Sequence, residues 1–351
     1  MEWKKSVRAV TPYIPGEQPQ NGKMIKLNTN ENPYPPAPGL KKLLCDTDTD
    51  RLRLYPDPDV TLLVRALAEY HGVDDNMVFV GVGSDDVLAM SFLTFFNSDK
   101  PILFPAVTYS FYDVWADLYR IKYETPALND DFTINVGDYS RPNGGIVIAN
   151  PNAPTSVAME PSAIEGIVAS NRDSVVIIDE AYVDFGGKSV ISLTGRYDNL
   201  LVVRTYSKSR SMAGVRIGYA VGNCELIKAL NSVKGSFNSY TMNMLSIAMG
   251  TESLKDEEYF RSVIAKIIHT REKTKASLES LGFKALPSQT NFLFVTHETV
   301  SAKVIFEELK KDNVYVRYFN KPLIDNYLRI TIGTDEEMDV LLERIGRICS
   351  P

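Results

Sequence analysis

Between residues 60 and 205 the sequence alternates short β-branched runs with longer segments of helical periodicity. Apolar residues fill the short runs almost without interruption, as in strands that are buried on both faces of a parallel sheet. The expected strands are 78–81, 102–104, 145–150, 175–179 and 200–203, and the expected helices are 60–70, 85–96, 110–118 and 161–170. This alternation predicts an α/β domain whose sheet is mainly parallel. Ligands of such sheets bind at the carboxyl ends of the strands.

The last third of the chain follows a different pattern. Residues 256–281 carry apolar side chains at helical spacing over an unusual length, and could join two domains. Beyond Gly282, the expected strands at 291–295, 314–317 and 327–332 and the expected helices at 302–311 and 335–348 form an α+β unit. Prolines disfavour a helix in the first 40 residues. We predict an extended arm at 1–40 that belongs partly to the small domain, a large domain at 41–255, and a small C-terminal domain at 256–351 that includes the linking helix.

The composition argues against several classes of function. The 351 residues carry a net charge of −6 and an isoelectric point near 5.3, unlike a general nucleic-acid or membrane-surface binder. No apolar run approaches the ~18 residues of a membrane span, and we expect no signal peptide. The cysteines Cys45, Cys224 and Cys349 are too scattered for a disulfide framework or a zinc site. We expect a cytoplasmic protein that acts on small molecules, without a metal, nucleic-acid or membrane partner.

Lys208 stands in a polar turn, 205–211, soon after the expected strand 200–203. Partial burial there would disfavour the ammonium form and make the amine a nucleophile suited to a Schiff base. The simpler alternative is a solvated lysine in a turn, because lysine is rarely buried. Arg216, before the next apolar run, is a candidate for binding an anion.

Two neighbouring strand ends carry further polar groups. Asp179 ends the most apolar strand, where a carboxylate needs a partner such as a protonated ring nitrogen, and Tyr182 follows three residues later. The turn 150–156, Asn-Pro-Asn-Ala-Pro-Thr-Ser, could donate amide hydrogen bonds. Each feature also has a purely structural interpretation. Asp179 could cap the next turn, and Asn-Pro pairs form turns in any protein.

A glycine-rich turn, Gly-Val-Gly-Ser-Asp-Asp at 81–86, connects an expected strand to its helix. Backbone N–H groups at the helix N-terminus could bind a phosphate there. Alternatively, the turn is an ordinary connection that Ser84 or Asp85 caps. Arg317 and Arg329 lie in expected strands and are further candidates for gripping an anion.

Together these residues make up the set that pyridoxal phosphate requires. A lysine serves its aldehyde, an acid its pyridinium nitrogen, hydroxyl and amide donors its 3-oxygen, and a glycine-rich turn with an arginine its phosphate. Tyr109, after the expected strand 102–104, adds an aromatic ring. We therefore predict a pyridoxal-phosphate site at the strand ends.

The chain resembles the histidinol-phosphate aminotransferases, a branch of the pyridoxal-phosphate enzymes of fold type I. The resemblance covers nearly the whole chain and is clearest in Asn-Glu-Asn-Pro-Tyr at 30–34, Tyr-Pro-Asp-Pro at 55–58, Asp-Glu-Ala-Tyr at 179–182, Ser-Lys at 207–208 and the stretch 214–218. It implies a large domain with a seven-stranded sheet, a smaller α+β domain and a homodimer. It also implies amino transfer between the glutamate/2-oxoglutarate pair and the histidinol-phosphate/imidazole-acetol-phosphate pair in histidine biosynthesis.

The same resemblance implies roles for individual residues. Lys208 would hold the cofactor covalently and move the α-proton, Asp179 would hold the pyridinium proton, and Tyr182 would bond the 3-oxygen. Ala153 stands where the family often has the asparagine ligand of that oxygen, so Asn152 would take over. The remaining cofactor contacts would come from Tyr109 on the ring and, around the phosphate, from Gly83, Ser84, Asp85, Ser207, Arg216 and a Tyr55 that reaches across from the partner subunit.

On the substrate side, the resemblance implies that Arg329 binds the anionic end of the amino donor. The other substrate contacts would come from Arg317, Tyr13, Asn30 and Asn32. Three alternatives stay open: an aromatic amino acid aminotransferase, a threonine-phosphate decarboxylase on the same fold, and a cofactor-binding regulator without turnover.

Overall fold

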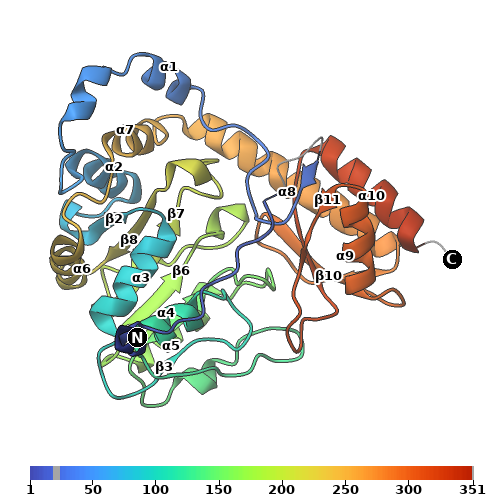
Figure 1. The fold of residues 1–351 in the computed structure, drawn as a ribbon, viewed down its shortest axis with the longest axis horizontal. Coiled ribbons are helices and arrows are strands. Elements are labelled where there is room, and N and C mark those ends of the chain that lie inside the picture. Colours follow the sequence, from blue (N-terminus) through green and yellow to red (C-terminus); the bar gives the residue numbers. More distant parts are fainter. Residues whose placement is uncertain (19–23, 350–351) are drawn as a thin grey trace.

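A seven-stranded sheet lies at the centre of the large domain in the computed structural model, which describes residues 1–18 and 24–349 (Figure 1). The strand order is β2-β8-β7-β6-β5-β3-β4; β8 pairs antiparallel with both β2 and β7, and the other pairs of these described strands are parallel. The strands are β2 (Val78–Gly81), β3 (Ile102–Leu103), β4 (Tyr123–Glu124), β5 (Ile146–Ala149), β6 (Val176–Asp179), β7 (Leu200–Thr205) and β8 (Gly218–Gly222). The predicted α/β fold with a mainly parallel seven-stranded sheet is confirmed.

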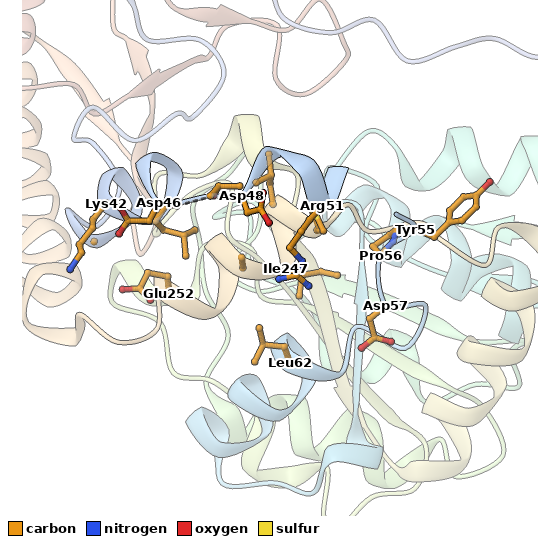
Figure 2. Close-up of a pocket in the computed structure, with 16 residues that line it drawn as sticks. Lys42, Asp46, Asp48, Arg51, Tyr55, Pro56, Asp57, Leu62, Ile247 and Glu252 are labelled. Carbon is orange, nitrogen blue, oxygen red and sulfur yellow. Dashed lines mark hydrogen bonds between the residues drawn. The ribbon is translucent and has the colours of Figure 1, made fainter. Parts of the chain in front are cut away.

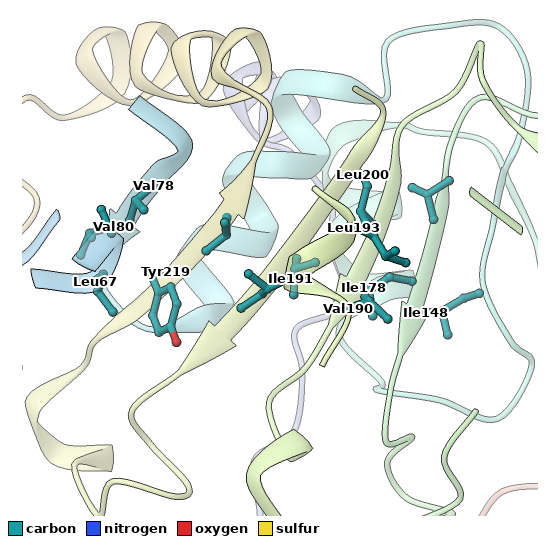
Figure 3. Close-up of a cluster of buried hydrophobic side chains, with 14 of the residues drawn as sticks. Leu67, Val78, Val80, Ile148, Ile178, Val190, Ile191, Leu193, Leu200 and Tyr219 are labelled. Atoms are coloured by element: carbon teal, nitrogen blue, oxygen red, sulfur yellow. The ribbon is translucent and has the colours of Figure 1, made fainter. Parts of the chain in front are cut away.

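Helices cover both faces of this sheet. Successive strand residues point to opposite faces, and the apolar residues on each face pack against helices. In β6, Val176 and Ile178 join one buried cluster, and Ile177 joins another. Figure 3 shows the first cluster, where Leu67 and Tyr219 lie among apolar strand residues. The first cluster includes residues of α2 (Thr61–His71), α5 (Pro161–Ser170) and α7 (Met244–Glu252), and the second includes residues of α3 (Ser84–Phe95), α4 (Tyr112–Tyr119) and α6 (Cys224–Phe237).

The small domain is a four-stranded antiparallel sheet with helices packed against it. Its strand order is β12-β13-β10-β9. The long helix α8 leads into it from the large domain (Figure 1). The elements are α8 (Glu257–Ser280), β9 (Phe283–Ala285), β10 (Phe292–His297), α9 (Ala302–Lys311), β12 (Arg317–Tyr318), β13 (Leu328–Thr331) and α10 (Asp335–Cys349). None of the described helices is long and apolar enough to cross a membrane.

The N-terminal segment crosses from the large domain to the small one (Figure 1). Its strand β1 (Ile25–Lys26) pairs in parallel with β11 (Val314–Tyr315). Leu27 is buried in the small-domain core, and its carbonyl accepts a hydrogen bond from the N–H of Thr331 at 3.0 Å. The segment that follows β1 is therefore held against the small domain while it approaches the carboxyl ends of the large sheet.

The structure differs from the sequence predictions in several places. The expected strand 314–317 is split, because β11 pairs with the arm whereas β12 pairs with β13. Helix α3 begins at Ser84, and the residue before it is Gly83 rather than a capping Ser84 or Asp85. Helices α6, α7 and α1 (Gly39–Cys45) lie in stretches for which the sequence pattern made no prediction.

Parallel pairing brings the polar strand ends to one edge of the sheet. Ala149 of β5 is in register with Asp179 of β6, and Asp179 with Val203 of β7. The turns that follow β5 and β7 therefore flank Asp179. This edge is where the candidate site lies.

Candidate active site

A cavity of about 160 Å³ opens at the carboxyl ends of β5, β6 and β7. Residues of the large domain and of the N-terminal segment line it together. The predicted residues in its wall are Ser84, Asp85, Tyr109, Asp179, Tyr182, Ser207, Lys208 and Arg216, and the wall also includes Thr29, Glu31, Ala149, Ala153, Ala181 and Ala213.

Lys208 points its amine into this cavity from the turn after β7. Its Nζ donates a hydrogen bond to the carbonyl of Thr29 at 3.1 Å and lies 5.9 Å from the centre of the Tyr182 ring. The side-chain amide of Asn32 donates to the backbone carbonyls of Lys208 and Ser209, each at 3.2 Å. The N-terminal segment thus contacts both the amine and the backbone of the lysine turn.

Asp179 is buried at the floor of the cavity, with 5% of its surface exposed. Burial raises the pKa of Asp179 to about 6, although hydrogen bonds from the Tyr112 hydroxyl (3.0 Å) and the Ala181 N–H (3.1 Å) favour its charged form. Among the described residues no lysine, arginine or histidine forms an ion pair with it. A buried carboxylate with no cation beside it suits a ligand that brings a positively charged N–H group.

Tyr182 forms one side of the cavity, and its hydroxyl faces Asn30. The ring packs edge-on against Phe292, with centroids 5.1 Å apart and an interplanar angle of 88°. The side-chain amide of Asn30 donates a hydrogen bond to the Tyr182 hydroxyl at 2.8 Å. The structure therefore places Asn30, a predicted substrate contact, against a predicted cofactor contact.

Arg216 crosses the N-terminus of helix α3. Its guanidinium contacts the Ser207 hydroxyl at 3.4 Å and the Asp85 carboxylate at 3.5 Å. A side chain at Gly83 would collide with it, because a Cβ there would lie 2.5 Å from Nη2 of Arg216. A Cβ at Gly218 would lie 2.2 Å from the backbone N of Ser84. These glycines let a guanidinium and helix N–H groups converge, which suits a phosphate.

Tyr109 closes the cavity beside this anion site. Its hydroxyl donates to the Asp85 carboxylate at 2.9 Å. Burial raises the pKa of Tyr109 well above its ordinary value, with the Asp85 charge adding to the effect. The phenol is therefore protonated at physiological pH and its ring faces the site.

Asn152 does not line the cavity. Its amide nitrogen donates to the Val107 carbonyl and the Thr155 hydroxyl, both at 2.9 Å, and its amide oxygen accepts from the Thr108 hydroxyl at 2.7 Å. The turn at 150–156 therefore presents the methyl group of Ala153 to the cavity instead of an amide. Asn152 therefore has no free amide atom with which to replace the asparagine ligand that the family often has at the position of Ala153.

Tyr55 also lies away from the cavity. It is 81% exposed and stacks on Tyr240 with centroids 4.7 Å apart. It borders a separate groove of about 660 Å³, which Figure 2 shows between the segment that carries Arg51 and helices α2 and α7. Leu62 and Ile247 lie in this groove, so its wall is partly apolar.

The predicted substrate arginines are paired across two strands of the small domain. Arg317 of β12 lies opposite Arg329 of β13. Arg329 donates to the Asn28 carbonyl at 3.0 Å, but its Nε is buried without a hydrogen-bond partner. Desolvation lowers the pKa of Arg329, and within the described part of the chain no carboxylate pairs with it. Arg317 contacts the Ile14 carbonyl at 3.4 Å, and Tyr13 stacks on Phe111 at 4.2 Å.

Sequence patterns missed a buried charge network behind the lysine turn. Arg204 of β7 forms an ion pair with Asp184, and the Ser209 hydroxyl donates to the same carboxylate at 2.6 Å. Burial opposes ionisation of Asp184, but the Arg204 charge holds its pKa below the ordinary value. Burial raises the pKa of the neighbouring Glu180 to about 7. An arginine inside an otherwise apolar strand was the signal that could have revealed this network.

The fold and the cavity define an enzyme built to hold a planar, phosphorylated, aldehyde-bearing cofactor. The family model for aminotransferases of class I and II matches residues 22–345, and the chain belongs to that family. Its relatives include two proteins named histidinol-phosphate aminotransferase. One, from Brachyspira hyodysenteriae, is 50% identical over 342 residues, which are 97% of each chain; the other, from Clostridium botulinum strain Okra, is 49% identical over 99% of this chain and 98% of its own.

Solved structures show the same fold at lower identity. The histidinol-phosphate aminotransferase of Clostridium acetobutylicum has a TM-score of 0.86 at 21% identity, over 93% of this chain and 99% of its own. The enzyme of the same name from Sinorhizobium meliloti, in complex with pyridoxal-5'-phosphate, has a TM-score of 0.84 at 22% identity, over 93% and 91%. These neighbours confirm the predicted fold type.

Pyridoxal phosphate is the cofactor of this family, and the cavity fits it. The buried Asp179 lacks a cation that a pyridinium nitrogen supplies, and Gly83 and Gly218 let the Arg216 guanidinium and the N-terminus of helix α3 come together, as a phosphate site requires. Lys208 lines the same cavity. When bound, the cofactor supplies a ring that takes up negative charge from the α-carbon of an amino acid.

Proposed function

We propose that this enzyme transfers an amino group between the glutamate/2-oxoglutarate pair and the histidinol-phosphate/imidazole-acetol-phosphate pair, as one step of histidine biosynthesis. The convergence of Lys208, Asp179 and Arg216 on one cavity is the observation that supports the chemistry. The identity of about 50% to relatives named histidinol-phosphate aminotransferase, over nearly the full chain, supports the substrate.

Each large-domain residue has a distinct task in this proposal. The Lys208 amine would hold the cofactor through its aldehyde carbon, and would carry a proton to and from the α-carbon of the amino acid. The Asp179 carboxylate holds the proton of the ring nitrogen, and the Tyr182 hydroxyl bonds the 3-oxygen. Tyr109 covers the ring. The phosphate is held by the N–H groups that follow Gly83, at Ser84 and Asp85, together with Ser207 and Arg216.

The small domain and the arm hold the substrate. Arg329 binds the carboxylate of glutamate, because its guanidinium is desolvated and has an unsatisfied Nε. Arg317 adds a second positive charge for a dicarboxylate or a phosphate ester, and Tyr13 and Asn32 border the same side. Two half-reactions at one site require ping-pong kinetics.

The proposal includes a homodimer with shared sites. Tyr55 is exposed, is not among the residues that line the cavity of its own chain, and borders a partly apolar groove. A second copy that covers this groove would receive the Tyr55 hydroxyl at its phosphate end. The three described cysteines are unpaired, which suits the reducing cytoplasm.

A side-by-side donor screen tests the function. The cofactor-loaded enzyme is mixed with glutamate, histidinol phosphate, phenylalanine or phosphothreonine, and both ketone and carbon dioxide are measured. We expect the visible absorbance of the cofactor to change with glutamate and histidinol phosphate, without release of carbon dioxide. A faster reaction with phenylalanine, or carbon dioxide from phosphothreonine, would replace the proposed substrate. No response to any donor would contradict the transaminase.

A further inference from the structure

Asn30 is one of the most tightly held polar residues in the described chain. It is 1% exposed, and each polar atom of its backbone and side chain has a hydrogen-bond partner. Its N–H donates to the Thr331 hydroxyl, its carbonyl accepts from the Asn291 amide, and its amide oxygen accepts from Thr331, all at 3.0 Å. The fourth bond, from its amide nitrogen, goes to the Tyr182 hydroxyl at 2.8 Å.

Thr331 decides which way the Asn30 amide faces. The Thr331 hydroxyl oxygen accepts a hydrogen bond from the backbone N–H of Asn30. A hydroxyl carries only one proton, and that proton needs an acceptor. Its own proton is given to the amide oxygen of Asn30. The amide NH₂ group is therefore left facing Tyr182. The backbone of Asn30 has a φ of 57°, a conformation that asparagine tolerates better than most residues, and this directs its side chain between the two domains.

The direction of this hydrogen bond fixes the direction of the next one. Because the Tyr182 oxygen accepts from Asn30, the Tyr182 proton is free to be donated to another group. Tyr182 lines the cavity, so a cofactor bound there would be within reach of this proton. The neighbouring turn offers no amide donor, since Ala153 presents a methyl group and both amide atoms of Asn152 are engaged.

We propose that Asn30 is a positioning residue that aims the Tyr182 proton at the 3-oxygen of the cofactor, in place of a direct donor from the 150–156 turn. This inference rests on the proposed function, because it assumes that Tyr182 bonds that oxygen. It extends that function by connecting the small-domain strand β13, which carries both Thr331 and Arg329, to the electronic state of the cofactor.

A donor at the 3-oxygen has a measurable effect. It stabilises the negatively charged oxygen, and so favours loss of the proton from the nitrogen that joins Lys208 to the cofactor. Weakening the donor should therefore raise the apparent pKa at which the visible absorbance of the resting enzyme titrates. A hydrogen bond to a charged group corresponds to a shift of about one unit.

The test is a double-mutant cycle read by a pH titration of that absorbance, without substrate. Asn30→Asp replaces the amide donor with an isosteric carboxylate that accepts the Tyr182 proton. We expect it to raise the apparent pKa by about one unit in the wild-type background and by little in the Tyr182→Phe background, where there is no hydroxyl to redirect. An unchanged pKa in the wild-type background would overturn the proposal. So would an equal rise in both backgrounds, because the new charge would then act directly.

Thr331→Val keeps the proposal testable where Asn30→Asp does not fold. It removes only the hydroxyl that orients the amide, so we expect a smaller rise in the same direction, and an unchanged pKa overturns the inference. Thermal melting of each variant confirms the fold. Failure of the proposed function is seen separately, as wild-type enzyme whose absorbance does not respond to glutamate.

Discussion

The cavity of the large domain and the predicted substrate side in the small domain differ in how their charged groups are paired. On the large-domain side, Asp179 receives two hydrogen bonds and Arg216 contacts Asp85 and Ser207. On the small-domain side, Arg329 has no carboxylate partner among the described residues and a buried Nε without a bond. The first side is organised before anything binds, as a resident cofactor needs. The second side keeps an unsatisfied cation, as a site that exchanges anionic substrates needs.

Lys208→Ala should have the largest effect, because it removes the covalent anchor and the proton carrier together. We expect amino transfer from glutamate to fall by at least about 10⁴-fold. The protein should still fold and bind the cofactor, since Asp179 and Arg216 remain. Initial rates and cofactor absorbance after gel filtration check both statements. Transamination near the wild-type rate in this variant would disprove the assignment of Lys208.

Asp179→Asn should reduce the rate by roughly 10²–10³-fold, the usual cost of removing one group that stabilises developing charge. The amide can still accept from Tyr112, but it cannot hold a proton on the ring nitrogen. The fall should appear in kcat for both half-reactions, which stopped-flow absorbance measures separately. A change confined to KM would place Asp179 on the substrate side instead.

Arg329→Gln tests whether the unpaired guanidinium of Arg329 binds the substrate carboxylate. We expect the KM for glutamate to rise by about 10²-fold, because a charge-assisted pair with the carboxylate is lost. Stability of the substrate-free enzyme should be unchanged or slightly higher, since a desolvated cation is removed. The matched control is Arg204→Gln, because Arg204 already has a carboxylate partner. This change leaves the buried Asp184 without its cation and should lower the free energy of unfolding by about 3 kcal/mol. Urea unfolding distinguishes the two arginines.

The pH dependence of cofactor-free stability should reveal Asp179. Burial raises its pKa from the ordinary 3.8 to about 6, so folding disfavours the charged form. There is no penalty below about pH 4, where both folded and unfolded chains are protonated; the penalty grows between pH 4 and 6 and is constant above. The Asp179→Asn variant has no carboxyl group at this position and therefore lacks this free-energy penalty. The cofactor-free variant should therefore exceed wild type by up to about 3 kcal/mol at pH 8 and match it near pH 4. An equal difference in unfolding free energy between variant and wild type at pH 4 and pH 8 would contradict the raised pKa of Asp179.

Local patterns predicted the large-domain side far better than the contacts between segments. Asp179 and Lys208 end continuous apolar strands, and parallel pairing brings such ends together, so their proximity followed from the sequence. Tyr112 meets Asp179 from 67 residues away, and Asn30 meets Tyr182 from 152 residues away. No spacing within one segment encodes such contacts. Asn152 shows the opposite error, because it has the right chemistry but its amide is used to hold its own turn.

Tyr55→Phe should have the smallest effect on the enzyme. It also tests which of the two chains in a dimer supplies Tyr55 to a given site. Tyr55→Phe removes one hydroxyl that we expect to reach the partner's phosphate end, so the cofactor dissociation constant should rise about tenfold. Mixing Tyr55→Phe chains with Lys208→Ala chains tests the geometry. In a mixed dimer, the site that retains Lys208 receives its tyrosine from the other chain and should bind the cofactor as tightly as wild type. If those sites keep the tenfold defect, Tyr55 serves its own chain and the shared-site proposal is wrong.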